Sequence, residues 1–102
     1  MLNNRGKYGE WELFSEATHK AILPTPLTPH FPAIEMDYGI GLQSYHERFA
    51  PDSYGHAGGC GTQLIVFPNE NVVFSMVRNN RGEDYKKHLA DTIDILNTRL
   101  DN

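Results

Sequence analysis

Two short apolar runs separated by four residues constrain the fold of this chain more than any other feature. The runs span residues 63–67 and 72–77, and the segment between them is Pro68-Asn69-Glu70-Asn71. Strand-length runs on both sides of a turn-forming tetrapeptide, the second rich in β-branched residues, predict an antiparallel hairpin. Because nearly every residue of both runs is apolar, we expect the hairpin to be covered on both of its faces.

An amphipathic helix is predicted after the hairpin. Residues 79–82 form a turn signal, and apolar residues then recur on one stripe that comprises Tyr85, Leu89, Ile93, Leu96 and Leu100. Glu83 and Asp84 place negative charge at the positive N-terminal end of this helix, and the spacing of Glu83 and Lys87 predicts an ion pair. We expect the apolar stripe to lie across one face of the sheet.

A third strand is predicted before the hairpin, over residues 38–46. Alternate positions there point to one face, namely Tyr38, Ile40, Leu42 and Ser44. The other face is kept small by Gly39 and Gly41, which indicates that another part of the molecule lies close to it. The three strands predict an antiparallel meander.

The region before the sheet divides into a helical arm, residues 1–23, and a proline-rich connector, residues 24–37. Ser15 is suited to cap a short helix that Pro24 ends, and Trp11, Leu13 and Phe14 indicate that the arm docks by packing. Four of the six prolines lie in residues 24–32, so we expect a stiff connector without regular structure. A proline-motif ligand for a partner domain is the alternative for this segment, although no basic anchor flanks it.

The length of 102 residues predicts a single domain over residues 1–102, with the sheet and the last helix in residues 38–102. The fold class is therefore α+β. A net charge of −4 without long runs argues against nucleic acid and anionic membranes as partners. No stretch has the length of a membrane span and the first residues are too polar for a signal peptide, so we expect a soluble chain of unassigned compartment.

The glycine-rich stretch over residues 54–62 carries the candidate chemistry. Five of its first eight residues are Gly or Ala, and His56 lies among them just before a buried strand. A ring nitrogen beside unobstructed backbone N–H groups predicts an oxyanion or carboxylate site. A bulge or tight turn is the structural alternative.

Other chemistries have weaker signals. The five histidines lack metal-ligand spacing, so the sequence predicts neither a metal nor a cofactor. The single Cys60 excludes an internal disulfide framework; beside His56 it could be drawn as a nucleophile, but a small packing residue is the simpler interpretation. The glycine-rich run also lacks the Gly-Lys-Ser/Thr ending of a phosphate-binding loop.

The order of these segments resembles the C-terminal part of the serine β-lactamase-like family, which includes class C β-lactamases, penicillin-binding DD-peptidases and related esterases. The matching segments are residues 1–9 with Leu13-Phe14-Ser15 after them, Tyr38-Gly39-Ile40-Gly41-Leu42, Tyr54-Gly55-His56-Ala57-Gly58-Gly59, the strand and Pro-Asn-Glu-Asn turn after it, the Val-rich strand ending in Arg78-Asn79-Asn80, and the final helix. The resemblance covers nearly the whole chain but only about the last third of a family member. It implies a partial β-lactamase-like fold.

The resemblance also implies site residues. The family's Lys or His, small residue and Gly beside the active site fall on His56-Ala57-Gly58. His56 would then help to hold the substrate carboxylate and the proton-transfer network, next to the small Ala57 and Gly58. The backbone N–H of Gly59 would be one of two oxyanion donors.

The chain departs from the family at the nucleophile. Neither the Ser-x-x-Lys motif nor the Tyr-x-Asn or Ser-x-Asn motif is present, and no serine has a lysine three residues later. We therefore expect a C-terminal fragment of a hydrolase for β-lactam, D-Ala-D-Ala peptide or ester substrates, inactive alone and lacking the upstream part of its parent. The alternative is a stand-alone α+β module that acts by self-association or by binding a ligand or partner.

Both hypotheses predict a homo-oligomer. A sheet edge and apolar surface that lack their cover would be hidden by a second copy, and exchange of the N-terminal arm is one way to do so. We expect Trp11, Phe14 and Phe31 in that contact.

Overall fold

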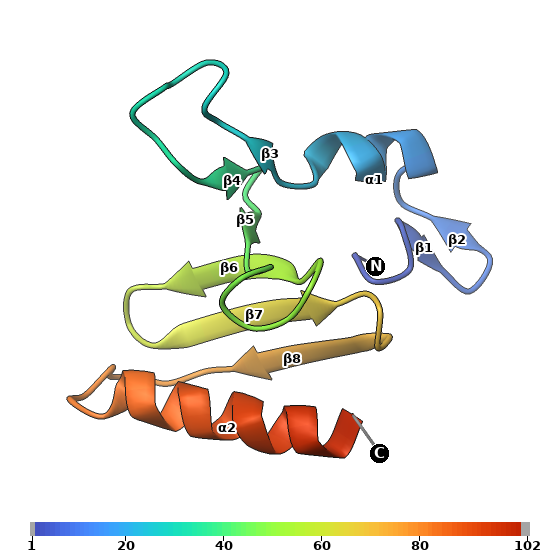
Figure 1. The fold of residues 1–102 in the computed structure, drawn as a ribbon. Helices are drawn as coiled ribbons and strands as arrows, with labels where there is room; N and C mark the ends of the chain where they lie inside the picture. Colours follow the sequence, from blue (N-terminus) through green and yellow to red (C-terminus); the bar gives the residue numbers. More distant parts are fainter. Residues whose placement is uncertain (1, 101–102) are drawn as a thin grey trace.

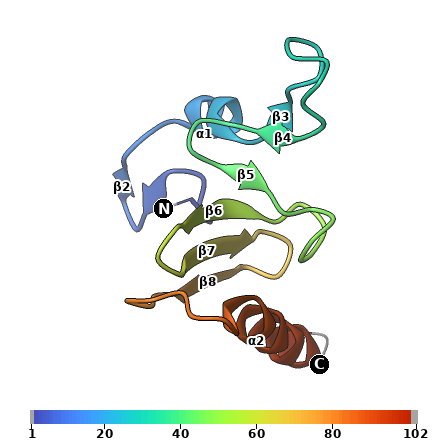
Figure 2. The ribbon, with the colours of Figure 1, turned by 90° about the vertical axis from the view of Figure 1, so that its left-hand side faces the viewer.

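A computed structural model describes residues 2–100 of the chain, without the side chain of Leu100. Its elements are β1 (Lys7–Tyr8), β2 (Trp11–Glu12), α1 (Glu16–Ile22), β3 (Thr25–Pro26), β4 (Asp37–Tyr38), β5 (Gln43–Ser44), β6 (Tyr54–Gly58), β7 (Thr62–Phe67), β8 (Val72–Met76) and α2 (Tyr85–Leu100). The α+β class is confirmed. α2 and the pair β7–β8 lie at one end of the molecule, and α1 lies at the other (Figures 1 and 2).

The main sheet is an antiparallel meander of six strands in the order β3-β4-β5-β6-β7-β8, with β1 and β2 in a separate pair. The sequence predicted three strands for this sheet, whereas the structure has six. The hairpin β7–β8 is confirmed, with Phe67 opposite Val72 and Gln63 opposite Met76. Covering on both faces is wrong for β8, because Val73, which points away from the α2 core, is 50% exposed.

The principal core lies between α2 and one face of β7 and β8. Tyr85, Leu89 and Ile93 are buried there against Ile65, Phe67 and Tyr45. The predicted stripe is thus confirmed as far as Leu96, whereas the side chain of Leu100 lies outside the described residues. The Glu83–Lys87 pair is wrong: α2 begins at Tyr85, and Lys87 instead pairs with Asp91 at 2.6 Å.

The single strand predicted over residues 38–46 is wrong. Gly41 adopts a φ of 70°, so the chain turns between β4 and β5, and Ile40 is 74% exposed while Leu42 is buried. The close approach predicted at the glycines is confirmed at Gly39. A Cβ there would meet the carbonyl of Ile22, at the end of α1.

The helix of the arm begins at the predicted cap, but the arm buries fewer side chains than we expected. The Ser15 hydroxyl accepts from the N–H of Thr18 at 3.1 Å, and α1 ends at Ile22 before Pro24. Trp11 and Leu13 do not pack on the rest of this chain, since both side chains are exposed. The connector is also not wholly irregular, because β3 pairs with β4 inside it. Within residues 2–100, neither helix combines the length and apolar character needed to cross a membrane.

Candidate functional site

The face of the sheet turned away from α2 carries His56. In the antiparallel register, Gly55 pairs with Ile65, and Ile65 packs in the α2 core. Side chains alternate along a strand, so His56 and its partner Leu64 point to the opposite face. His56 is exposed on this face.

The main neighbour of the His56 ring is Tyr38. The Tyr38 hydroxyl lies 3.5 Å from His56 Nδ1, and the two rings meet edge to face with centroids 6.4 Å apart. Tyr38 was placed on a strand face by its sequence pattern but was not predicted as a site residue. Only the sheet order brings it close, because β4 and β6 both flank β5.

The small residues after His56 leave open backbone at the end of β6. Ala57 and Gly58 are exposed, and Gly58 pairs with Thr62, whose hydroxyl a Cβ at Gly58 would meet. Gly59 lies in the following turn, and a Cβ there would meet nothing within 4 Å. The backbone at Gly59 is therefore accessible to a ligand.

A complete catalytic constellation is not assembled here. Within residues 2–100, no hydrogen bond joins a serine hydroxyl or the exposed Cys60 thiol to His56. In the same range, no three His, Cys, Asp or Glu side chains are grouped to hold a metal ion. In this part of the chain, His56 is therefore not placed as the base of a Ser or Cys nucleophile.

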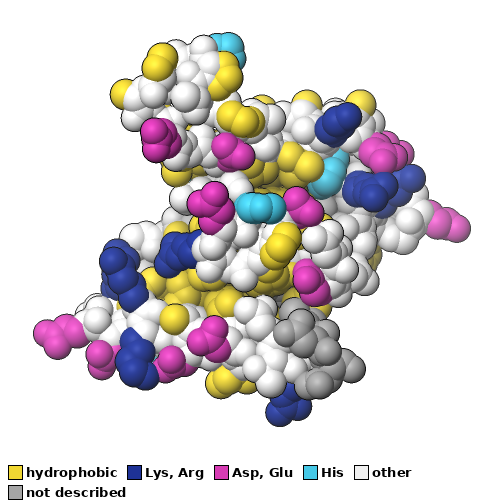
Figure 3. Space-filling view, viewed as in Figure 1, with side chains coloured by type: hydrophobic (Ala, Val, Ile, Leu, Met, Phe, Trp, Pro, Cys, Tyr) yellow, Lys and Arg dark blue, Asp and Glu magenta, His cyan; other side chains and the backbone are white. Residues whose placement is uncertain are grey.

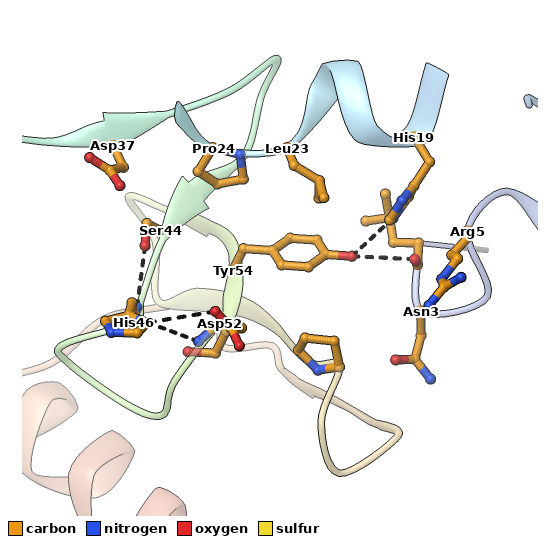
Figure 4. Close-up of a pocket in the computed structure, with 13 residues that line it drawn as sticks. Asn3, Arg5, His19, Leu23, Pro24, Asp37, Ser44, His46, Asp52 and Tyr54 are labelled. Atoms are coloured by element: carbon orange, nitrogen blue, oxygen red, sulfur yellow. Dashed lines mark hydrogen bonds and ion pairs between the residues drawn. The ribbon is translucent and has the colours of Figure 1, made fainter. Parts of the chain in front are cut away.

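A cavity of about 560 Å³ lies apart from His56, between the arm and the sheet. Its walls come from the first residues of the chain, α1 and the segment after it, β5, β6 and the loop before β6. The side chain of Tyr54 crosses it, with Leu23 and Pro24 above (Figure 4). The sequence alone does not predict this cavity, because its lining residues are dispersed along the chain and share no motif.

The hydroxyl of Tyr54 is held at one end of this cavity. It donates to the carbonyl of Leu2 at 3.3 Å and lies 3.4 Å from His19 Nε2, which then acts as the donor in that contact. Burial raises the pKa of Tyr54 from its usual value of 10.0, because the phenolate would lose hydration. Tyr54 is therefore a neutral hydrogen-bonding group at neutral pH.

The opposite end of the cavity is built around the β5–β6 loop. His46 Nδ1 accepts the backbone N–H of Asp52 at 3.0 Å, and the Asp52 carboxylate accepts from the Asn69 amide at 3.2 Å. Asp37 and Ser44 lie at the same end (Figure 4). Acidic side chains and a histidine also gather around this hollow in the space-filling view (Figure 3).

Comparisons with family models, with curated proteins and with solved structures found no match to this chain.

Proposed function

We propose that this chain is the C-terminal segment of a serine β-lactamase-like hydrolase and contributes one wall of its active site. The observation that carries the proposal is the placement of His56 on the sheet face that α2 leaves uncovered, followed directly by accessible backbone at Gly59. This is the arrangement that the resemblance implies for the family's His-x-Gly strand. The chain alone is catalytically silent, because no nucleophile contacts His56 within residues 2–100.

In the assembled enzyme, His56 would hold the carboxylate of a β-lactam, a D-Ala-D-Ala peptide or a related ester. The N–H of Gly59 would donate to the developing oxyanion, together with the N–H of a nucleophile from the upstream part. Two exposed apolar side chains support the proposal that another part of the parent protein covers this region of the sheet. Val77, just after β8, is 77% exposed, and Val73, within β8, is half-exposed.

The second candidate is a stand-alone α+β module that works by self-association. Its support is the arm and the connector: Trp11 of the arm is 79% exposed and Phe31 of the connector is 56% exposed, while Phe14 is half-buried against Gly6. Exchange of the arm between two copies would bury these rings. Sedimentation across a range of concentrations tests the association that both candidates predict, because a monodisperse monomer at high concentration contradicts the exchanged homo-oligomer.

Hydrolysis assays test whether the chain is silent. The purified chain is incubated with a chromogenic cephalosporin and a short-chain p-nitrophenyl ester, beside His56→Ala and the matched control His30→Ala in the exposed connector. We expect no turnover above buffer for all three. Turnover that disappears only in His56→Ala would show that the chain assembles a nucleophile itself, and Cys60→Ser would be the next variant.

A chimera tests the positive part of the proposal. Residues 54–62 replace the corresponding strand of a characterised class C β-lactamase, so that His56 enters a complete active site. We expect measurable turnover that falls about 100-fold with His56→Ala and is largely restored by His56→Lys, because either side chain can hold a carboxylate. Equal activity of the Ala and His chimeras would contradict the assignment of His56.

A further inference from the structure

The cavity crossed by Tyr54 has the properties of a small-molecule site, and this inference does not rest on the proposed function. Its volume of about 560 Å³ lies within the usual range for ligand pockets. Its walls combine apolar surface from Leu2, Leu23, Pro24 and Pro68 with a few polar groups at the two ends. Such a combination suits a ligand with an apolar body and one polar or charged end.

The end near Arg5 and His19 offers little attraction for a charged group. Arg5 is already paired with Glu16, at 3.0 Å between Nη1 and Oε1. The hydroxyl of Tyr54 is occupied by the carbonyl of Leu2 and the ring of His19. Arg5 and Tyr54 therefore already have partners at this end, and Asn3 Oδ1 is a buried acceptor without a hydrogen-bond partner within residues 2–100. An uncharged amide oxygen attracts a charged group less than a carboxylate does.

The end near Asp37 and Asp52 is acidic. Asp37 has no side-chain partner within residues 2–100. His46 lies at the same end, where its Nδ1 is 3.0 Å from the backbone nitrogen of Asp52 and 3.8 Å from the Asp52 carboxylate. A second hollow of about 330 Å³ shares Asp37, Ser44 and His46 with the cavity, and its lining adds two more carboxylates, Glu35 and Glu47, against the single cation Arg48.

We propose that this cavity binds a small organic cation, an amine with an aromatic or aliphatic body. The ammonium group lies at the Asp37 and Asp52 end, where carboxylate oxygens accept its hydrogen bonds. The body packs against Leu23 and Pro24, which lie above the buried side chain of Tyr54 (Figure 4).

Three probes of nearly equal shape test this proposal: 2-phenylethylamine, 2-phenylethanol and 3-phenylpropionate. Each is titrated into the ¹⁵N-labelled full chain at pH 7, and binding is read from amide shifts. We expect the amine to give saturable shifts at Ser44, Tyr54 and His46 in the millimolar range. The alcohol should bind several-fold more weakly, and the carboxylate should give no saturable shifts.

Charge-removing variants assign the ammonium position. Asp37→Asn and Asp52→Asn should each weaken amine binding about three- to fivefold, since exposed ion pairs contribute modestly, and the double variant should weaken it about tenfold. Asp94→Asn is the matched control, because Asp94 lies on α2 against the other face of the sheet. Dispersed spectra of all variants confirm that they fold.

Every other pattern overturns the proposal. Equal affinity for the amine and the alcohol would show an apolar cavity without charge selection, and preference for the carboxylate would show that the Arg5 end dominates. Amine shifts that spread over the acidic surface without saturation, or that Asp94→Asn weakens as much as Asp52→Asn does, would show non-specific attraction. No shifts with any probe would show that the cavity does not take ligands of this class. None of these outcomes bears on the role of His56, so the proposed hydrolase function stands or falls separately.

Discussion

The two ends of the molecule are built in different ways. At the α2 end, Ile65 and Phe67 are fully buried and Leu89 is 1% exposed, all in one continuous core. At the arm end, α1 has no buried residue, and Trp11 and Leu13 face solvent. We infer from this difference that the stability of the fold comes mainly from the packing of α2 on the sheet. The arm is held to the sheet by only a few backbone and side-chain contacts.

Those few contacts are specific. The N–H of Ile40 donates to the carbonyl of Ile22 at 3.0 Å, which fixes the end of α1 on the β4–β5 turn. Leu2, Ile22 and Leu23 pack against a small second core formed by Leu42, Tyr54 and Val66. The cavity lies between the arm and the sheet, so its shape depends on the weaker part of the molecule.

The largest expected effect is at Phe67. Phe67→Ala should lower the free energy of unfolding by about 3–5 kcal/mol, because it leaves a large void in a fully buried site. Trp11→Ala, which removes a larger ring that is 79% exposed, should change it by less than about 0.5 kcal/mol. Urea unfolding followed by circular dichroism measures both. If Phe67→Ala does not fold, Phe67→Leu should show a smaller loss in the same direction, and similar values for the Phe67 and Trp11 variants would refute the comparison.

The next effect separates the arm from the core. In Gly39→Ala the new methyl group collides with the backbone carbonyl of Ile22, and we expect a loss of about 1–3 kcal/mol together with release of α1. Gly59→Ala is the control, because its methyl group meets open space, and it should change stability by less than about 0.5 kcal/mol. Limited proteolysis of residues 13–36 measures the release of the arm. Equal protection of the two variants would mean that the Gly39 contact does not hold the arm.

The sequence predicted the parts of the fold that depend on local pattern. The hairpin over β7 and β8, the cap at Ser15 and the α2 stripe followed from spacing and turn chemistry alone. The alternation over residues 38–46 predicted one continuous strand wrongly, because a period of two does not reveal that the chain turns at Gly41. The short strands β3 to β5 arise from the path of the chain over the sheet edge, which no local pattern records.

The His56 site and the cavity also differ in how far the sequence alone predicts them. His56 and the glycines after it are contiguous, so the sequence could single them out as a possible site, and the structure places them together at the end of β6. Tyr38 contacts His56 only through the order of β4, β5 and β6. The cavity joins α1 to the β5–β6 loop across large sequence separations, and pairs such as His46 and Asp52 have no recognisable spacing.

A smaller effect is expected at the cap of α1. Ser15→Ala removes the acceptor for the Thr18 N–H and should destabilise the helix by about 1 kcal/mol. Because α1 has no buried residue, this loss should appear as local opening rather than as a shift of the global unfolding midpoint. Hydrogen exchange at Thr18 and His19 should accelerate about fivefold while Leu89 exchanges as before. A matching acceleration at Leu89 would show that arm and core unfold as one unit.

The smallest effect at neutral pH is expected at Tyr54, where the two halves meet. Its pKa is raised above 10.0 in the folded chain, so above about pH 10 the unfolded chain loses its phenolic proton more readily than the folded chain does. The free energy of unfolding should therefore be independent of this group below pH 10 and should fall as the pH rises from 10 through the folded-state pKa. Tyr54→Phe removes this dependence at a cost of about 1 kcal/mol near pH 7 for the lost hydrogen bond to Leu2. Urea midpoints at pH 7 and at several values above pH 10 measure the difference, with Tyr8→Phe as the exposed control. An alkaline loss of equal slope in the wild-type and Tyr54→Phe chains would show that the arm does not keep this hydroxyl from water.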